Sequence, residues 1–199
     1  MQQIGNDVSI KIQTGVYGQF RNLNNKPWYA LAEFVDNAVQ SYENNKTKFK
    51  SIYGDSYSLE IRIDINKDED VITIKDNAAG IGLDNYYRAF EPAHIPIDNT
   101  GLHEYGMGMK TAAIWLSNIW TVNTKAIDEN EERFVEFNLQ KVIDEKKEVL
   151  EVIKTPNKTK VHYTEISLTK LSHNAPSSHQ LDKIKRHLTN IKILIYLYI

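Results

Sequence analysis

The sequence predicts an α/β fold of two layers, a mixed and mostly antiparallel sheet with helices on one face. Residues 59–65 alternate apolar and polar side chains, and residues 71–74 return with a second apolar pattern after a charged turn. Such alternation on both sides of a short turn is typical of an antiparallel hairpin with one face in water. Residues 27–42 carry apolar side chains at helical spacing, and Pro27 suits a first helical position. A sheet built on this hairpin and covered by this helix gives the two layers.

The other expected elements follow in order along the chain. Upstream of the hairpin, the patterns predict an edge strand over 8–16, a turn over 22–26, the helix over 27–42 and a loop over 44–55. Downstream, they predict a helix over 83–90, a loop over 91–104, a helix over 112–116, strands near 119–124, 133–139, 148–154 and 161–171, a link over 172–178 and a C-terminal helix over 181–191. The last seven residues are apolar and either pack as core or lead into a longer chain.

Composition limits the classes of function. With 199 residues, of which 41% are hydrophobic, the chain can bury one sizeable core or two small ones. The net charge of -2 disfavours a protein that binds nucleic acid mainly through phosphate contacts. The chain has no cysteine, which excludes disulfides and thiolate metal sites. Its first ten residues lack the apolar run of a signal peptide, and no apolar stretch approaches the ~20 residues of a membrane span. We therefore expect a cytoplasmic protein that does not enter a membrane.

The first candidate site is the stretch from Glu33 to Asn37. In a helix these two residues are one turn apart and point from the same face. A carboxylate beside an amide oxygen could hold a metal-bound phosphate and activate a water against it. An ordinary amphipathic helix with a solvated polar face would show the same pattern and is the favoured interpretation of this stretch alone, until the two stretches below are added.

The second candidate site follows the hairpin, where Asp76 ends a strand and leads into Asn-Ala-Ala-Gly-Ile-Gly. A carboxylate at a strand end, followed by small residues, lets a flat ligand approach the backbone closely. The alternative is a plain turn from strand to helix, because Asp, Asn and Gly are common turn residues.

The third candidate site is the stretch from Tyr105 to Thr111, Tyr-Gly-Met-Gly-Met-Lys-Thr, which opens a helix. Glycines at a helix start expose backbone N–H groups at the positive end of the helix, which suits a phosphate. The spacing is not that of a P-loop. The loop over 91–104 before it is long enough to serve as a lid or a binding loop.

These three stretches, in this order, resemble the GHKL superfamily, which includes the gyrase B subunit, the ninety-kilodalton heat-shock chaperone, histidine kinases, MutL and the MORC proteins. The resemblance covers residues 27–171, and residues 101–110 look most like the MORC-like and bacterial relatives. It implies the Bergerat-type ATP-binding fold, with ATP held between the helices and the lid.

The resemblance also implies roles for single positions. Glu33 matches the general base that acts on the attacking water, and Asn37 matches the asparagine whose amide oxygen holds magnesium. Asp76 matches the aspartate that accepts a hydrogen bond from the adenine amino group. Lys110 is either a phosphate contact or a surface lysine. The positions assigned to ATP and Mg2+ binding are Asn37, Asp76, Gly80, Gly82, Gly106, Met107, Gly108, Met109, Lys110 and Thr164.

The sequence departs from the superfamily pattern in places. Ala78 stands where a glycine is usual, so the turn must avoid a positive φ or accept strain. Tyr163 stands where a glycine usually precedes the threonine, which puts the contact from Thr164 in doubt. No segment supplies the second domain that delivers a further lysine in several GHKL ATPases. Other conspicuous side chains are expected to be structural: Trp28, Trp115 and Trp120 as core residues, with no metal spacing between His94 and His103.

The predicted function is Mg2+-dependent ATP binding with slow hydrolysis, as the N-terminal motor of a longer protein that closes as an ATP-dependent homodimer. Residues 1–175 would form the ATP-binding domain, and residues 176–199 a C-terminal helix leading into further domains that engage nucleic acid or a protein client. Glu33 disfavours the first alternative, a histidine-kinase catalytic domain, because those kinases generally carry asparagine there. The second alternative is a nucleotide-sensing module without useful turnover, and the third is a nucleic-acid-binding domain.

Overall fold

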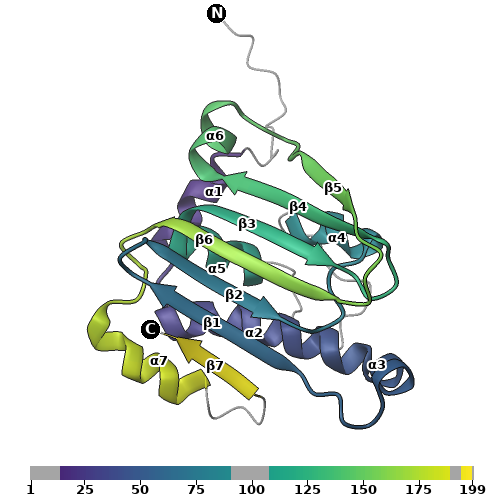
Figure 1. Ribbon diagram of the computed structural model, residues 1–199. Coiled ribbons are helices and arrows are strands. Elements are labelled where there is room, and N and C mark those ends of the chain that lie inside the picture. The colour runs from purple at the N-terminus through teal and green to yellow at the C-terminus, as the bar shows by residue number, and fades with distance from the viewer. Residues whose placement is uncertain (1–13, 91–107, 189–193, 199) are drawn as a thin grey trace, which may run out of the picture.

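A seven-stranded sheet runs through the part of the chain that the structure describes. The computed structural model describes residues 14–90, 108–188 and 194–198. The strand order is β5-β4-β3-β6-β2-β1-β7. Neighbouring strands are antiparallel except β1 and β7, which run parallel at one edge (Figure 1). The strands are β1 (Glu60–Asn66), β2 (Val71–Asp76), β3 (Ser117–Lys125), β4 (Glu131–Asn138), β5 (Val152–Pro156), β6 (Tyr163–Leu171) and β7 (Leu194–Tyr198).

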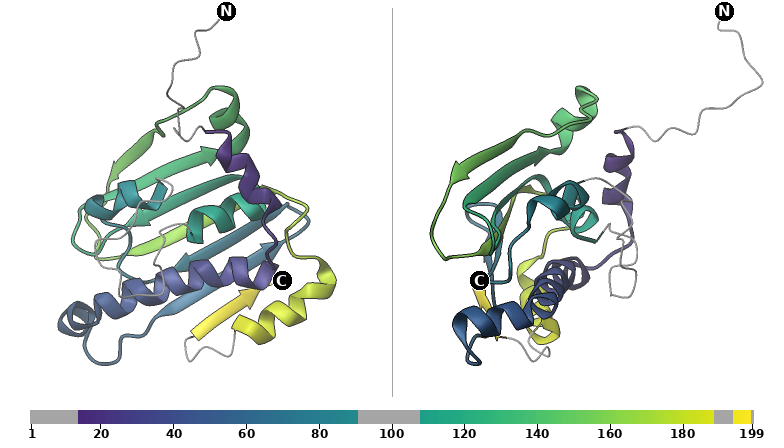
Figure 2. Two further views of the ribbon diagram at one scale, coloured as in Figure 1. Left: turned by 180° about the vertical axis from the view of Figure 1, so that it is seen from behind. Right: turned by 90° about the vertical axis from the view of Figure 1, so that its right-hand side faces the viewer.

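The helices form the second layer. Figure 2, seen along the sheet, has α2 and α5 on one face, which is the arrangement that the sequence predicted. The opposite face of the sheet is open over the central strands (Figure 1). The helices are α1 (Val16–Gln19), α2 (Pro27–Asn44), α3 (Lys46–Tyr53), α4 (Leu83–Phe90), α5 (Gly108–Leu116), α6 (Leu139–Asp144) and α7 (Leu181–Leu188), with short 3-10 turns η1 (Phe20–Asn22) and η2 (Ser178–Gln180).

The core lies between these two layers. Every second residue of β1 is buried, and in the pairs Ile63–Ile74 and Ile65–Ile72 the partner in β2 is buried with it. Phe34 and Val35 of α2 pack in the same core cluster. The period of two in the strands and the helical period in α2 thus both turn their apolar sides inward. The three tryptophans are buried, as predicted.

The hairpin, the helix of α2 and the strand β6 are confirmed close to their predicted bounds. The N-terminal strand is not: residues 8–13 lie outside the described residues, and Val16 begins helix α1 instead. The physical reason is aromatic packing, since Tyr17 in α1 meets Phe137 edge to face at 5.3 Å between ring centroids. Helix α6 was not predicted either, and Asn138 caps it by accepting a hydrogen bond from the backbone N–H of Lys141.

The predicted loop over 44–55 is wrong, because residues 46–53 form helix α3. Polar residues dominate this stretch, but Phe49 is 1% exposed. Its ring stacks on Tyr57 at 4.9 Å and on Tyr42 at 5.2 Å. The burial of this one aromatic side chain therefore stabilises a helix in a segment whose polar composition favoured a loop.

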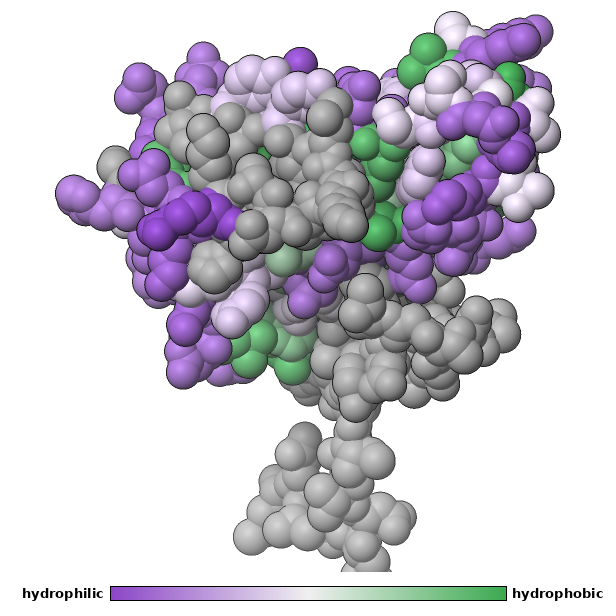
Figure 3. Space-filling model, turned by 90° about the horizontal axis from the view of Figure 1, so that it is seen from below, coloured by the Kyte–Doolittle hydropathy of each residue, from purple (hydrophilic) through white to green (hydrophobic). Residues whose placement is uncertain are grey.

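The described residues on the face seen in Figure 3 are mostly polar. Figure 3 views the molecule from below, and apolar residues there gather in small separate areas among hydrophilic ones. Within residues 14–90, 108–188 and 194–198, no helix combines the length and the apolar composition that crossing a bilayer requires. The C-terminal residues add a strand to the sheet: β7 pairs with β1, with Ile195 opposite Ile61.

The packing of α3 gives a first prediction. Phe49→Ala should lower the free energy of unfolding by about 3–5 kcal/mol, because it removes a buried ring and leaves a cavity. Ile52→Ala on the same helix is the matched control, since Ile52 is 47% exposed and its loss should cost within ~0.5 kcal/mol. Urea denaturation of both variants measures the difference. Equal losses would mean that Phe49 does not anchor α3.

Candidate functional site

Helix α2 presents Glu33 and Asn37 on the side away from its buried stripe. Both residues are partly exposed, while Phe34, Val35 and Ala38 are buried. The side-chain nitrogen of Asn37 donates to the backbone carbonyl of Glu33 at 2.7 Å. The amide nitrogen is thus engaged with the helix, and the amide oxygen lies on the opposite side of the group. An oxygen held in this way can serve as a ligand for a hard cation.

The start of helix α5 lies against Glu33. A Cβ atom on Gly108 would stand 2.0 Å from the Glu33 Oε2 atom, so a side chain at this position would force the carboxylate to move. Lys110, in the first turn of α5, is 3% exposed and is therefore not the surface lysine of one alternative. A carboxylate and the positive end of a helix thus meet where α2 and α5 pack together, and Lys110 is buried in the same turn of α5.

Asp76 ends β2 as predicted, directly opposite Thr164 of β6. Its Oδ1 atom accepts a hydrogen bond from the backbone N–H of Ala78 at 2.9 Å. Ala78 is buried and avoids a positive φ, so alanine in place of glycine brings no backbone strain here. The Thr164 side chain is buried, with its Oγ1 atom 3.3 Å from that of Thr124. Asp76 and Thr164 are therefore neighbours, as the sequence predicted.

Burial changes the acid–base behaviour of Asp76. It raises the pKa of the carboxyl group to about 7, although hydrogen bonds from the backbone N–H groups of Ala78 and Thr164 act in the opposite direction. Desolvation disfavours the charged form of a carboxylate, and hydrogen-bond donors favour it. Carboxyl groups with a shifted pKa are common at catalytic and ligand-binding sites.

The segment from Ala79 to Gly82 is fixed by the end of β3. Gly80 has a φ of 71°, and a Cβ there would lie 2.2 Å from the Lys125 carbonyl oxygen. The backbone N–H of Ile81 donates to Thr124 Oγ1 at 2.9 Å. The protein backbone itself therefore requires glycine at position 80.

Charged side chains fix the Gly82 end of this segment, and their role was not predicted from the sequence. Arg133 forms an ion pair with Glu129, and Lys125 Nζ donates to the Glu129 carbonyl oxygen at 2.9 Å. Glu129 Oε1 accepts from the backbone N–H of Leu83 at 2.9 Å, at the start of α4, and lies beside Gly82. A carboxylate near a helix N-terminus is favourable, so this network fixes α4 relative to β3.

The predicted residues thus fall into two groups that share one core. Ala78 of the Asp76 turn and Ala38 of α2 belong to the same buried cluster, which also contains Ala112 of α5. Met109 packs against this cluster. Gly106, Met107, the lid over 91–104, His94 and His103 lie outside the described residues.

Two contacts to the Asp76 turn were not predicted, from Tyr57 and His162. The one sequence signal for them was the position of His162 just before Tyr163 and Thr164.

Comparison with known families agrees with this arrangement. The model of the family described as "Histidine kinase-, DNA gyrase B-, and HSP90-like ATPase" matches residues 25–174. This chain belongs to that family. It is therefore a GHKL ATPase domain, of a family whose members bind ATP, typically with Mg2+, and generally hydrolyse it. The likeness to MORC proteins in particular stays a prediction.

Solved structures support the same fold. The ATPase region of Saccharomyces cerevisiae topoisomerase II, bound to ICRF-187 (dexrazoxane), is similar with a TM-score of 0.64 at 15% sequence identity. The similarity covers 85% of this chain and 47% of that one, so this GHKL domain spans about half the length of the topoisomerase region. No curated protein sequence matches this chain.

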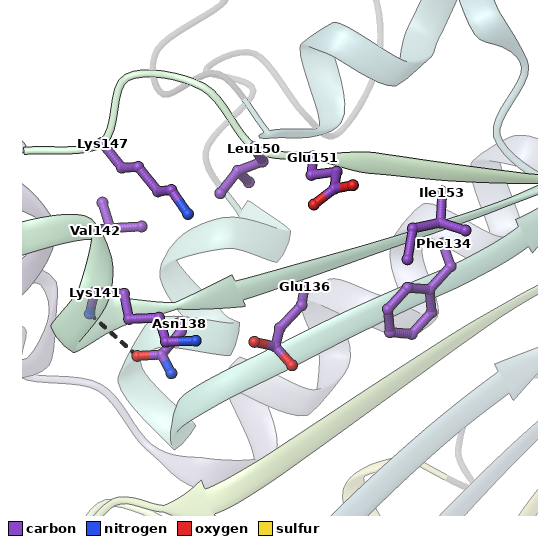
Figure 4. A pocket seen from close by; sticks show the side chains of 9 residues that line it. All are labelled: Phe134, Glu136, Asn138, Lys141, Val142, Lys147, Leu150, Glu151 and Ile153. Carbon is purple, nitrogen blue, oxygen red and sulfur yellow. Dashed lines mark hydrogen bonds between the residues drawn. The ribbon is translucent and has the colours of Figure 1, made fainter. Parts of the chain in front are cut away.

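A hollow of about 190 Å³ lies far from these residues, between β4, α6 and the segment that leads into β5 (Figure 4). It contains none of the predicted site residues of the GHKL domain, and its charged side chains are of both signs. Its lining consists of Phe134, Glu136, Asn138, Lys141, Val142, Lys147, Leu150, Glu151 and Ile153. Among the described residues there is no group of three or more histidine, aspartate or glutamate side chains that could hold a metal ion.

The contact between Gly108 and Glu33 gives a second prediction. Gly108→Ala should cost about 0.5–1.5 kcal/mol of stability, because the added methyl group overlaps the Glu33 carboxylate and forces this side chain out of its rotamer. In a Glu33→Ala background the same change should be nearly neutral, since the space is then free. Chemical denaturation of the two single variants and the double variant measures a coupling free energy, expected at about 0.5–1.5 kcal/mol. Strict additivity would contradict the contact.

The raised pKa of Asp76 gives a third prediction. The folded protein holds this proton up to about pH 7, while an unfolded aspartate loses it near pH 4. The stability that this proton contributes is thus present below pH 4 and is lost as the pH rises to about 7. Relative to Asp76→Asn, the wild type should therefore lose free energy of unfolding between pH 5 and pH 7, by less than ~1.4 kcal/mol per pH unit, which is the limit for a single proton. Parallel curves for the two proteins would rule the shift out.

Proposed function

We propose that this chain is a Mg2+-dependent ATP-binding domain that hydrolyses ATP slowly. The observation that carries the proposal is the position of the Glu33 carboxylate against Gly108, at the start of α5, with Asn37 one helical turn away. A general base, a cation ligand and a helix N-terminus are then close enough to act on one phosphate chain.

The residues present fit magnesium and the phosphates. Asn37 would hold the cation through its amide oxygen, because its amide nitrogen is already bonded to the helix backbone. The first N–H groups of α5 would meet phosphate oxygens, with the Glu33 carboxylate beside Gly108. Lys110 would add positive charge in the same turn. When bound, magnesium would reduce the negative charge of the phosphates that the attacking water meets.

Asp76 would select the base. Its carboxylate lies at a strand end beside the small residues 78–80, and as an ionised acceptor it suits the amino group of adenine. Guanine presents a carbonyl oxygen at the same position, which the carboxylate would repel. Because the pKa of Asp76 is about 7 without ligand, binding of an amino group would also favour the ionised form.

Glu33 would act on the water. Its carboxylate oxygen accepts a proton as the water oxygen forms a bond to the terminal phosphorus, and the bond from that phosphorus to the bridging oxygen breaks. Products are ADP and inorganic phosphate, and the proton on Glu33 returns to solvent. Two carboxylates thus have separate tasks, with Asp76 holding the base and Glu33 acting on the water.

Further parts of the proposal rest on the superfamily resemblance. These parts are the role as N-terminal motor of a longer protein, the ATP-driven closure of a homodimer, and the binding of nucleic acid or a protein client by further domains. The division into an ATP-binding domain over 1–175 and a C-terminal segment over 176–199 belongs with them, as does a cytoplasmic location. Nucleotide sensing without turnover is the competing function, and the same experiment tests it.

A fourth prediction separates binding from chemistry. Glu33→Ala should bind ATP at about the wild-type affinity and lose ~10²–10⁴-fold in hydrolysis, the usual contribution of a positioned base. Asn37→Ala should lose the magnesium dependence of binding. Calorimetry with ATP, together with phosphate release, measures both quantities.

Glu43→Ala is the matched control for that experiment, because it removes an exposed carboxylate from the same helix. It should change neither binding nor hydrolysis. Wild-type turnover by Glu33→Ala would exclude the assigned base and favour the sensing function. Equal affinities for ATP and GTP would exclude the role of Asp76.

A further inference from the structure

The peptide unit between Asn77 and Ala78 is held on both sides. Its N–H, which belongs to Ala78, donates to Asp76 Oδ1 at 2.9 Å. Its carbonyl oxygen, which belongs to Asn77, accepts from the Tyr57 hydroxyl at 2.6 Å. A continuous chain of hydrogen bonds thus runs from the Tyr57 hydroxyl through one peptide unit to the Asp76 carboxylate. Bonds in such a chain polarise each other, so the first one strengthens the second.

The next peptide unit is held by His162. This side chain is 5% exposed, and its Nδ1 atom lies 2.6 Å from the carbonyl oxygen of Ala78. A carbonyl oxygen can only accept, so Nδ1 carries the proton. The His162 Nε2 atom lies 3.5 Å from the Tyr57 hydroxyl. Two side chains that are 105 positions apart in sequence therefore fix the two carbonyl groups that follow Asp76.

Aromatic packing keeps both side chains in place. The rings of Phe49 and Tyr53 lie 4.9 and 4.8 Å from the Tyr57 ring, and both also contact His162. Tyr42 donates from its hydroxyl to the Tyr57 backbone carbonyl at 3.0 Å. These rings leave Tyr57 and His162 little freedom, so the peptide units that they bind are fixed before any ligand arrives.

We propose that Tyr57 and His162 are positioning residues that set the selectivity of this site for adenine. They act through the backbone of Asn77 and Ala78 and hold the Asp76 carboxylate in the orientation that accepts the amino group of the base. The inference rests on the proposed role of Asp76 and extends it to side chains that make no contact with the nucleotide. A buried acceptor discriminates only when its direction is fixed, because a carboxylate free to rotate can turn away from a base that offers no donor.

The test compares ATP with purine riboside triphosphate, which lacks the 6-amino group. Tyr57→Phe removes the hydroxyl and keeps the ring. It should leave the affinity for purine riboside triphosphate unchanged and reduce the ratio of the two affinities by about 3- to 10-fold. Tyr53→Phe is the matched control, because it removes a hydroxyl from the same aromatic cluster, one that donates to the Lys160 carbonyl at 2.8 Å instead. It should leave the ratio at the wild-type value.

A second pair of variants covers the case in which Tyr57→Phe does not fold. His162→Leu removes the donor to Ala78 and should also reduce the ratio, while His162→Asn keeps a nitrogen donor near the Nδ1 position and should restore it in part. An unchanged ratio in Tyr57→Phe, or equal losses in Tyr57→Phe and Tyr53→Phe, would overturn the inference.

The wild type and Asp76→Asn separate this inference from the proposed function. If the wild type already fails to distinguish the two nucleotides, Asp76 does not read the amino group and both proposals fall. If Asp76→Asn abolishes the distinction while Tyr57→Phe and His162→Leu keep it, Asp76 reads the base without help and only the positioning inference falls.

Discussion

The approach of α5 to α2 depends on a position without a side chain. Gly108 lies so close to the Glu33 carboxylate that a single methyl group would force that carboxylate to move. Both helices also bury apolar residues in one cluster with the sheet, so their spacing cannot change without opening the core. The position of the proposed catalytic base is therefore set by packing over the whole domain. In this way a local constraint at one glycine ties the chemistry to the stability of the fold.

Periodic patterns were enough to predict most of the fold. The alternation in β1 and β2 gave the hairpin, and the helical spacing behind Pro27 gave α2, because each pattern reflects one buried face. The motif residues Glu33, Asn37, Asp76 and Gly108 were found because each lies at the end or on the polar face of such an element, whereas Thr164 came from the superfamily resemblance. Short elements held by distant partners were missed. Helix α3 depends on Phe49 and α1 on Tyr17, and neither aromatic stands in a periodic pattern.

The supporting residues around the site could not be predicted for a related reason. Tyr57 and His162 meet only after β6 has paired with β2, since one precedes β1 and the other precedes β6. Arg133 and Glu129 are close in sequence, but Glu129 accepts from the distant backbone N–H of Leu83 only once the segment before α4 lies beside β3. Sequence shows which residues can do chemistry. The residues that orient them are selected by contacts between strands far apart in the chain.

Alanine at position 78 has a thermodynamic consequence. A glycine at the same place would give the unfolded chain many more backbone conformations to lose, and would let the turn relax in the folded protein. With alanine, the turn loses its conformational entropy during folding, and the buried methyl group of Ala78 packs in the core. A nucleotide then meets a turn that is already ordered. Its binding should therefore carry little entropic cost for loop ordering at this end of the site.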